Sequence, residues 1–148
     1  MTNIDEYDPM TGTIALILAG GRGTRLGGDT PKQYLEIAGV SILRRTIEAF
    51  AAHPRVDAVG AVIHPDDAAR YDTATDGLAL LDPVFGGEKR QESSYNGLKN
   101  INEYDPEKVL IHDAARPFVD AGTIDRVLDA LDQAPAAIAA IPVTDTIK

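Results

Sequence analysis

Apolar residues along the chain form short runs and helical spacings that alternate with polar, glycine-rich segments. Uninterrupted apolar runs predict buried strands at residues 13–19, 56–63, 108–112 and 136–141. Apolar side chains three and four residues apart predict helices at residues 41–52, 65–71, 91–101 and 120–133. The repeated order of strand, loop and helix predicts an α/β domain, with a mostly parallel sheet that helices cover on both faces.

Within the helix predicted at residues 91–101, the apolar spacing places Tyr95, Leu98 and Ile101 on the buried face. Residues 1–12 are polar and acidic and carry no such pattern, so we expect a flexible tail there. The length of 148 residues is about that of one domain, which we expect to begin at residue 13.

The first predicted strand runs into a glycine-rich loop that suits a phosphate group. The loop contains Gly20, Gly21 and Gly23, which have no side chain to cover their backbone N–H groups. Successive uncovered N–H groups form an anion site. Three cations lie close to them in the sequence, namely Arg22, Arg25 and Lys32. The spacing matches neither the dinucleotide-binding fingerprint nor the P-loop. The alternative is a glycine turn with solvated arginines.

A second glycine loop, at residues 86–91, precedes a predicted helix, whose N-terminus favours anions. In a parallel sheet it would lie at the same edge as the first loop, where ligands bind. Glu88 and Ser93 are candidates to hydrogen-bond a base amino group, whereas Glu92 is better explained as compensation of the helix dipole.

Asp113 follows an apolar strand at the point where the chain leaves the sheet, opposite the phosphate loop. A carboxylate there is a natural ligand for Mg²⁺, which combines one or two carboxylates with phosphate oxygens and water. The alternatives are a turn-capping aspartate, or an ion pair with Arg116 that holds the loop. His112 would face the other side of the sheet, and we interpret it as structural.

Composition and charge limit what the protein can bind and where it can reside. The formal net charge of −9 argues against nucleic acid, because binding to a phosphate backbone needs a basic surface. No apolar run approaches the roughly 20 residues of a membrane span, and there is no cysteine for a disulfide or thiolate site. We therefore expect a cytoplasmic protein. Its charged loops suit phosphoryl or nucleotidyl transfer, which depends on positioning, metal and cations.

Five motifs, in order, carry a specific resemblance to one enzyme family. They are Leu-Ala-Gly-Gly-Arg-Gly-Thr-Arg-Leu at 18–26, Pro-Lys-Gln-Tyr at 31–34, Gly-Gly-Glu-Lys-Arg at 86–90, Ile-His-Asp-Ala-Ala-Arg-Pro at 111–117 and Pro-Val-Thr-Asp-Thr-Ile-Lys at 142–148. From residue 14 to the last, the chain resembles 2-C-methyl-D-erythritol 4-phosphate cytidylyltransferases. That family makes a CDP-alcohol and pyrophosphate from CTP and a sugar-alcohol phosphate in non-mevalonate isoprenoid synthesis. The resemblance implies a three-layer, Rossmann-like nucleotidyltransferase fold.

The resemblance also implies a role for each site residue. Arg25 and Lys32 would stabilise the pentacoordinate α-phosphate, and Asp113 would bind Mg²⁺ or another divalent cation beside it. CTP would be bound by Ala19, Gly20, Gly21, Gly23, Gly87, Glu88, Arg90, Ser93 and Ala114. The acceptor phosphate would be held by Arg116 and by Thr146, the latter donated across a homodimer.

The chain departs from the family pattern at two residues and in length. Gly20 stands where many members carry alanine and Glu88 where many carry aspartate; we expect both changes to be tolerated. The family's catalytic domain is longer, which implies that the domain at 13–148 is incomplete at its C-terminus. Some relatives continue into a cyclodiphosphate synthase domain. Two alternatives stay open: a ribitol 5-phosphate cytidylyltransferase, which shares these loops, and a CTP-binding module without turnover.

Overall fold

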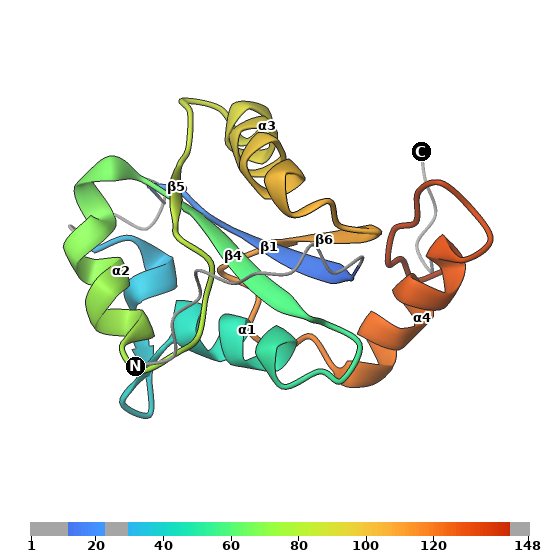
Figure 1. The fold of residues 1–148 in the computed structure, drawn as a ribbon. Coiled ribbons are helices and arrows are strands. Elements are labelled where there is room, and N and C mark those ends of the chain that lie inside the picture. Colours follow the sequence, from blue (N-terminus) through green and yellow to red (C-terminus); the bar gives the residue numbers. More distant parts are fainter. Residues whose placement is uncertain (1–11, 23–29, 143–148) are drawn as a thin grey trace, which may run out of the picture.

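Four parallel strands form the central sheet in the computed structural model, which describes residues 12–22 and 30–142 (Figure 1). In sheet order they are β5 (Val84–Phe85), β4 (Ala58–Ile63), β1 (Thr13–Ala19) and β6 (Lys108–Asp113). Strand β1 lies in the middle and pairs in parallel with both β4 and β6. The predicted α/β fold with a mostly parallel sheet is therefore confirmed.

Helices cover both faces of this sheet and give the fold its three layers (Figure 1). Helix α3 (Arg90–Ile101) lies on one face and α1 (Ile42–Ala51) on the other, with α2 (Ala68–Thr75) and α4 (Ala121–Leu131) beside the two ends of α1. The connecting elements are η2 (Lys32–Tyr34), β2 (Glu36–Ile37), β3 (Val40–Ser41), η3 (Pro65–Asp67) and η4 (Asn102–Tyr104). None of the helices in the described part of the chain is long and apolar enough to cross a membrane.

Helices α1 and α4 form where the apolar pattern predicted them, and each begins at a side-chain cap. The Ser41 hydroxyl accepts a hydrogen bond from the Arg44 N–H at 3.1 Å, and Asp120 accepts one from the Thr123 N–H at 2.6 Å. These bonds satisfy donors that the first helical turn leaves unpaired. The bond to Thr123 also lowers the pKa of the Asp120 carboxyl below its ordinary value.

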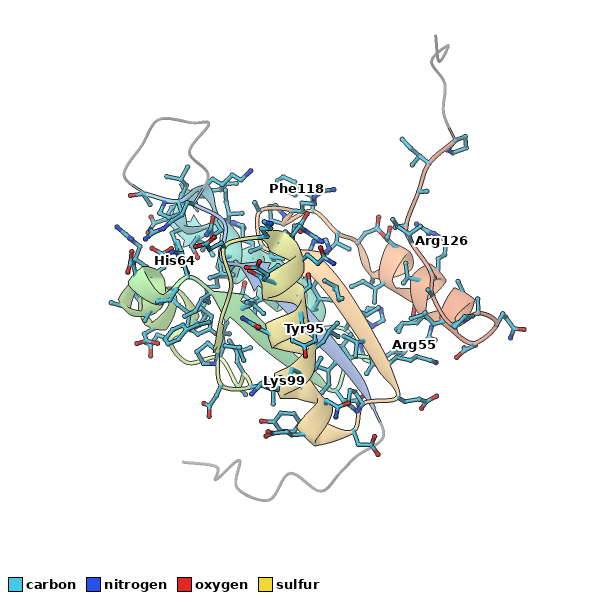
Figure 2. All side chains as sticks on the ribbon, turned by 90° about the horizontal axis from the view of Figure 1, so that it is seen from above. Arg55, His64, Tyr95, Lys99, Phe118 and Arg126 are labelled. Carbon is cyan, nitrogen blue, oxygen red and sulfur yellow. The ribbon has the colours of Figure 1, made fainter. Side chains whose placement is uncertain are left out.

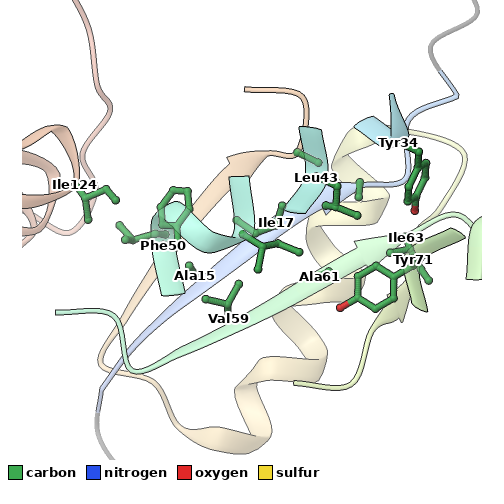
Figure 3. Packing of buried hydrophobic residues seen from close by; sticks show 14 of the residues in the cluster. Ala15, Ile17, Tyr34, Leu43, Phe50, Val59, Ala61, Ile63, Tyr71 and Ile124 are labelled. Atoms are coloured by element: carbon green, nitrogen blue, oxygen red, sulfur yellow. The ribbon is translucent and has the colours of Figure 1, made fainter. Parts of the chain in front are cut away.

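Two apolar clusters, one on each face of the sheet, hold the layers together. The cluster on the α1 face includes Ala15, Ile17, Leu43, Ile47, Phe50, Val59, Ala61 and Ile63 (Figure 3). The cluster on the α3 face contains Ile14, Leu16, Leu18, Val62, Leu81 and Ile101. Because side chains alternate along a strand, β1 contributes to both clusters and is buried over its whole length.

Tyr34 and Tyr71 lie together at one end of the α1-face cluster, beside Ile63 (Figure 3). Burial raises the pKa of both phenols, that of Tyr71 from 10.0 to about 12. A phenol that ionises at a higher pH in the folded chain than in the unfolded chain stabilises the fold at neutral pH. This contribution is complete below pH 10.0 and is lost as the pH rises through about 12.

Between pH 10.0 and about 12, we expect the free energy of unfolding to fall less steeply with pH in Tyr71→Phe than in the unchanged chain. Phenylalanine keeps the buried ring but has no proton to lose in the unfolded chain. Urea titrations across this pH range measure the effect. Tyr95→Phe is the control, since the Tyr95 ring is exposed and points away from α3 (Figure 2). Equal slopes for Tyr71→Phe and the unchanged chain would contradict the assignment.

The buried face of α3 differs from the predicted one. Tyr95 and Leu98 are 66% and 37% exposed, so the prediction is wrong for both. The residues that face the sheet are Ser93, Gly97 and Ile101. A Cβ at Gly97 would lie 2.6 Å from side-chain atoms of both Leu16 and Val62. The helix therefore approaches the sheet through its smallest residue, and the side chains of Tyr95 and Leu98 are turned outward.

Residues 136–141 do not form the predicted last strand, and this prediction is wrong. Ile138 and Ile141 are 89% and 88% exposed. A groove of about 650 Å³ runs between β6, α4 and the segment at residues 135–139. A strand needs a neighbour for its backbone hydrogen bonds. In the part of the chain that the structure describes, the groove lies between this segment and the outer edge of β6, and no strand pairs with the apolar run.

Candidate functional site

The order of the strands places a topological switch point at the carboxyl end of β1. The chain passes from β1 through α1 to β4 and outward to β5, and α3 then carries it to β6 on the other side of β1. Ligands bind beyond the carboxyl ends of the strands at such a point. The glycine loop at residues 20–22 follows β1, and the turn that begins at Asp113 ends β6. The first glycine loop and the Asp113 turn therefore begin at neighbouring strand ends.

Gln33 holds the first glycine loop in place. Its side-chain Nε2 donates to the Ala19 carbonyl at 2.7 Å and to the Gly21 carbonyl at 2.9 Å. Gln33 is buried and belongs to η2, so these two bonds tie η2 to the end of β1. Gly21 itself is exposed, and a Cβ there would meet no described atom within 4 Å, so a ligand can approach its backbone. In the sequence, Gln33 stands out only as part of the Pro-Lys-Gln-Tyr motif, which does not indicate this role.

We expect Gln33→Met to lower the free energy of unfolding by about 1–3 kcal/mol, because a buried carbonyl loses its donor. Methionine has a similar length but cannot donate a hydrogen bond. The affinity of the loop for a phosphate group should fall in parallel, since the loop is no longer held. Urea unfolding and titration with a nucleoside triphosphate measure the two effects. Gln91→Met, at the exposed start of α3, is the matched control and should change neither.

Of the cations near the first glycine loop, Arg22 is already paired. Its guanidinium forms ion pairs with Asp66 and, at 3.4 Å, with the fully buried Asp67. Asp67 also accepts a hydrogen bond from Arg70 at 2.6 Å. Lys32 differs, because its side chain is exposed and forms no ion pair or hydrogen bond within residues 12–22 and 30–142. Arg22 therefore anchors the loop to η3. Among the cations of this loop that the structure describes, Lys32 is the one that remains for a ligand.

Ser93 lies between the two glycine loops and bonds to the second. Its buried hydroxyl oxygen accepts a hydrogen bond from the Gly87 N–H at 3.2 Å. A Cβ at Gly86 would lie only 2.5 Å from this oxygen, so no side chain fits there. A Cβ at Gly20, in the first loop, would lie 3.6 Å away, which is an ordinary contact. The space at Gly20 therefore admits the alanine that many family members carry.

Glu92 caps the start of α3, in agreement with the role in compensating the helix dipole that the sequence predicted. Its Oε2 accepts hydrogen bonds from the backbone N–H groups of Glu88 at 3.0 Å and Lys89 at 3.4 Å. This arrangement satisfies open donors at the helix start and opposes the positive end of the helix dipole. The Glu88 side chain is exposed, and its contact with cytosine stays a prediction.

Asp113 has two guanidinium partners. Its Oδ1 accepts from Arg90 Nε at 3.1 Å and from Arg90 Nη2 at 2.9 Å. Its Oδ2 lies 3.2 Å from Arg116 Nε. The ion pair with Arg116 that the sequence left as an alternative is thus present, and Arg90 adds a partner that the sequence did not indicate. Asp113 lies opposite Leu18 in the strand register, which places its side chain on the α3 face.

The residues beside this carboxylate fasten the turn to the sheet and to α1. The Ala114 N–H donates to the backbone of β1 at 3.0 Å, and its carbonyl accepts from Thr46 Oγ1 at 2.8 Å. On the opposite face, the His112 ring packs against Phe50 with 4.9 Å between the ring centroids. His112 Nε2 also lies 2.9 Å from the Arg116 carbonyl oxygen. The structural role predicted for His112 is confirmed.

The family model described as "IspD: 2-C-methyl-D-erythritol 4-phosphate cytidylyltransferase" matches residues 13–148. The chain belongs to the IspD family. The resemblance drawn from the five motifs is therefore confirmed, and the description of the family model is that of a cytidylyltransferase.

Relatives and solved structures agree with the family. The bifunctional enzyme IspD/IspF of Paramagnetospirillum magneticum is 55% identical over 139 residues, which make up 94% of this chain and 36% of that enzyme. A crystal structure of a 4-diphosphocytidyl-2C-methyl-D-erythritol synthase has a TM-score of 0.77 and 30% identity, over 93% of this chain and 63% of its own. The crystal structure of the 2-C-methyl-D-erythritol 4-phosphate cytidylyltransferase from Thermus thermophilus has a TM-score of 0.62 and 30% sequence identity. The match covers 92% of this chain and 57% of that one. The chain thus spans about a third of the curated relative's length.

Three of the IspD-type site residues predicted from the sequence lie outside the described residues: Gly23, Arg25 and Thr146. Their roles stay predictions. The remaining ones do share the carboxyl edge of the sheet, but in two layers. Asp113 and Arg90 are on the α3 side, whereas Lys32 belongs to η2, which contacts α1 and α2. A ligand that uses both groups must therefore cross the edge of the sheet.

The chemistry of the donor set at Asp113 fits a divalent cation only if the ligand supplies further oxygens. Within the described residues, no group of three or more histidine or acidic side chains is placed to hold a metal ion. One carboxylate together with phosphate oxygens and water is the set that Mg²⁺ prefers. The two guanidinium groups at Asp113 show that a cationic group can reach each of its oxygens.

Proposed function

We propose that the chain is the CTP-binding part of an enzyme that transfers the cytidylyl group of CTP to 2-C-methyl-D-erythritol 4-phosphate. The observation that carries the proposal is the position of Asp113. It ends β6 beside the two glycine loops, at the switch point of a sheet in a chain of the IspD family. A carboxylate, uncovered backbone N–H groups and a free lysine are together the groups that a metal-bound triphosphate needs.

In this reaction an oxygen of the acceptor phosphate attacks the α-phosphorus of CTP. The bond from that phosphorus to the β-phosphate oxygen breaks, and pyrophosphate leaves with the electron pair. No covalent bond to the protein is required, so the chain acts by positioning and by stabilising negative charge. The N–H groups of Gly20 and Gly21 would face the phosphates, and Gly87, whose N–H is bonded to Ser93, would line the base. Lys32 and Arg25 would stabilise the charge that develops on the α-phosphate.

Asp113 would hold the divalent cation, and Mg²⁺ is the cation that its donor set favours. When bound, Mg²⁺ neutralises phosphate oxygens and makes the α-phosphorus easier to attack. Arg116 and Thr146 would hold the acceptor phosphate, with Thr146 reaching the site from the second subunit of a homodimer. We place this enzyme in the cytoplasm, where its nucleotide substrate is found.

Calorimetric titration with CTP, with and without Mg²⁺, tests the binding part of the proposal. We expect binding that requires Mg²⁺ and that ATP does not reproduce. A pyrophosphate-release assay with 2-C-methyl-D-erythritol 4-phosphate tests turnover, and ribitol 5-phosphate in its place tests the acceptor. Binding without turnover would favour a CTP-binding module. Failure to bind CTP, or equal binding of ATP, would contradict the proposal.

A further inference from the structure

Arg90 occupies one of the two oxygens through which Asp113 could hold a metal ion. Two nitrogens of its guanidinium, Nε and Nη2, converge on the single oxygen Oδ1 at 3.1 and 2.9 Å. The other oxygen, Oδ2, is held by Arg116 at 3.2 Å. Both carboxylate oxygens therefore already have a cationic partner.

The two arginines hold Asp113 from different places. Arg116 is three residues further along the same turn, and the backbone N–H of Arg116 also donates to the Asp113 carbonyl at 3.1 Å. Arg90 comes from the first residue of α3, 23 residues earlier in the chain, and its side chain is 64% exposed. Arg116 thus belongs to the turn that orients the carboxylate. Arg90 reaches it from another element and can move away without disturbing that turn.

We propose that Arg90 is a positioning residue that covers the Oδ1 atom of Asp113 in the ligand-free protein and leaves it when the metal–nucleotide complex binds. This inference rests on the proposed function. A guanidinium and a divalent cation cannot share one oxygen at short distance, because their like charges repel. Free metal must therefore compete with Arg90, whereas a metal carried by CTP brings phosphate oxygens to which the released guanidinium can turn. The exchange makes Asp113 select a metal–nucleotide complex over a bare metal ion.

The test is the affinity of the chain for Mn²⁺ without nucleotide, measured from the electron paramagnetic resonance signal of free Mn²⁺. We expect Arg90→Gln to bind Mn²⁺ about fivefold more tightly than the unchanged chain, near the upper end for release from an exposed ion pair. The gain should vanish in the double variant Arg90→Gln, Asp113→Asn. Arg126→Gln, an equal charge change on the exposed side of α4 (Figure 2), should leave Mn²⁺ affinity unchanged.

Arg116→Gln separates this role from a general effect of charge. If Arg90 covers the metal position, Arg116→Gln gives a clearly smaller gain than Arg90→Gln; equal gains would overturn the inference, as would no gain for Arg90→Gln. For Mg²⁺-CTP the same Arg90→Gln change should weaken binding, because the released guanidinium is missing. If the unchanged chain binds Mg²⁺-CTP while Arg90→Gln leaves Mn²⁺ affinity as it was, the inference fails and the proposed function stands. If no variant binds Mg²⁺-CTP, the proposed function itself fails.

Discussion

Replacing Lys32 by alanine should lower the rate of CTP-dependent pyrophosphate release by roughly 10²- to 10³-fold, the usual cost of losing one group that stabilises transition-state charge. The Lys32 amine is exposed and has no partner in the described part of the chain, so it is free for a phosphate. For the same reason its removal should leave the melting temperature unchanged. A large loss of rate without a loss of stability is therefore expected from this variant.

The comparison for Lys32→Ala is Lys99→Ala, on the outer side of α3 (Figure 2). Lys99→Ala makes the same change in charge and in side-chain length on an exposed surface, and we expect it to keep the full rate. Initial rates at saturating CTP, Mg²⁺ and acceptor separate the chemical step from binding. If Lys32→Ala retained the rate of Lys99→Ala, Lys32 would have no part in catalysis.

Replacing Gly97 by alanine should lower the free energy of unfolding by about 1–3 kcal/mol, the typical cost of overpacking a core. A Cβ at this position would lie 2.6 Å from the side chains of Leu16 and Val62, both buried in the α3-face cluster. Because the contact is with packed side chains of the sheet, α3 must move outward to relieve it. That movement would also shift Ser93 and the second glycine loop, so CTP affinity should fall as well.

Gly122→Ala provides the matched control for Gly97→Ala. Gly122 is also helical, near the start of α4, and a Cβ there would first meet the flexible end of the Arg126 side chain at 3.3 Å. Alanine favours a helix over glycine by up to about 1 kcal/mol, so this variant should be neutral or more stable. Chemical denaturation of both variants decides the matter. A Gly97→Ala protein as stable as Gly122→Ala would show that α3 does not pack as closely as described.

These expectations divide the site into two kinds of residue. Gln33, Ser93 and Gly97 are buried, and they fix the two glycine loops and α3 relative to the sheet. Lys32 and Arg90 are exposed at the carboxyl edge, and we expect them to meet the ligand. Changes to the first kind should lower stability and affinity together, whereas changes to the second should alter affinity or rate alone.

Much of this protein followed from local pattern. The apolar runs of β1, β4 and β6 and the apolar faces of α1 and α4 are each contained in fewer than twelve consecutive residues, so they can be recognised without knowledge of the fold. The first glycine loop and Asp113 follow predicted strands directly, and the rule that parallel strands end at one edge predicts that they lie together. The five motifs then identified the family.

The tertiary structure alone decided the contacts between residues that are distant in the sequence. The orientation of α3 depends on the space that Leu16 and Val62 leave for Gly97, and the absence of a strand at residues 136–141 depends on the groove beside β6. The ion pairs of Arg22 with Asp67 and of Arg90 with Asp113 likewise join residues 45 and 23 positions apart. Residue types and spacing specify which groups the chain carries. Only packing in three dimensions determines which of them are already neutralised and which remain free to bind a ligand.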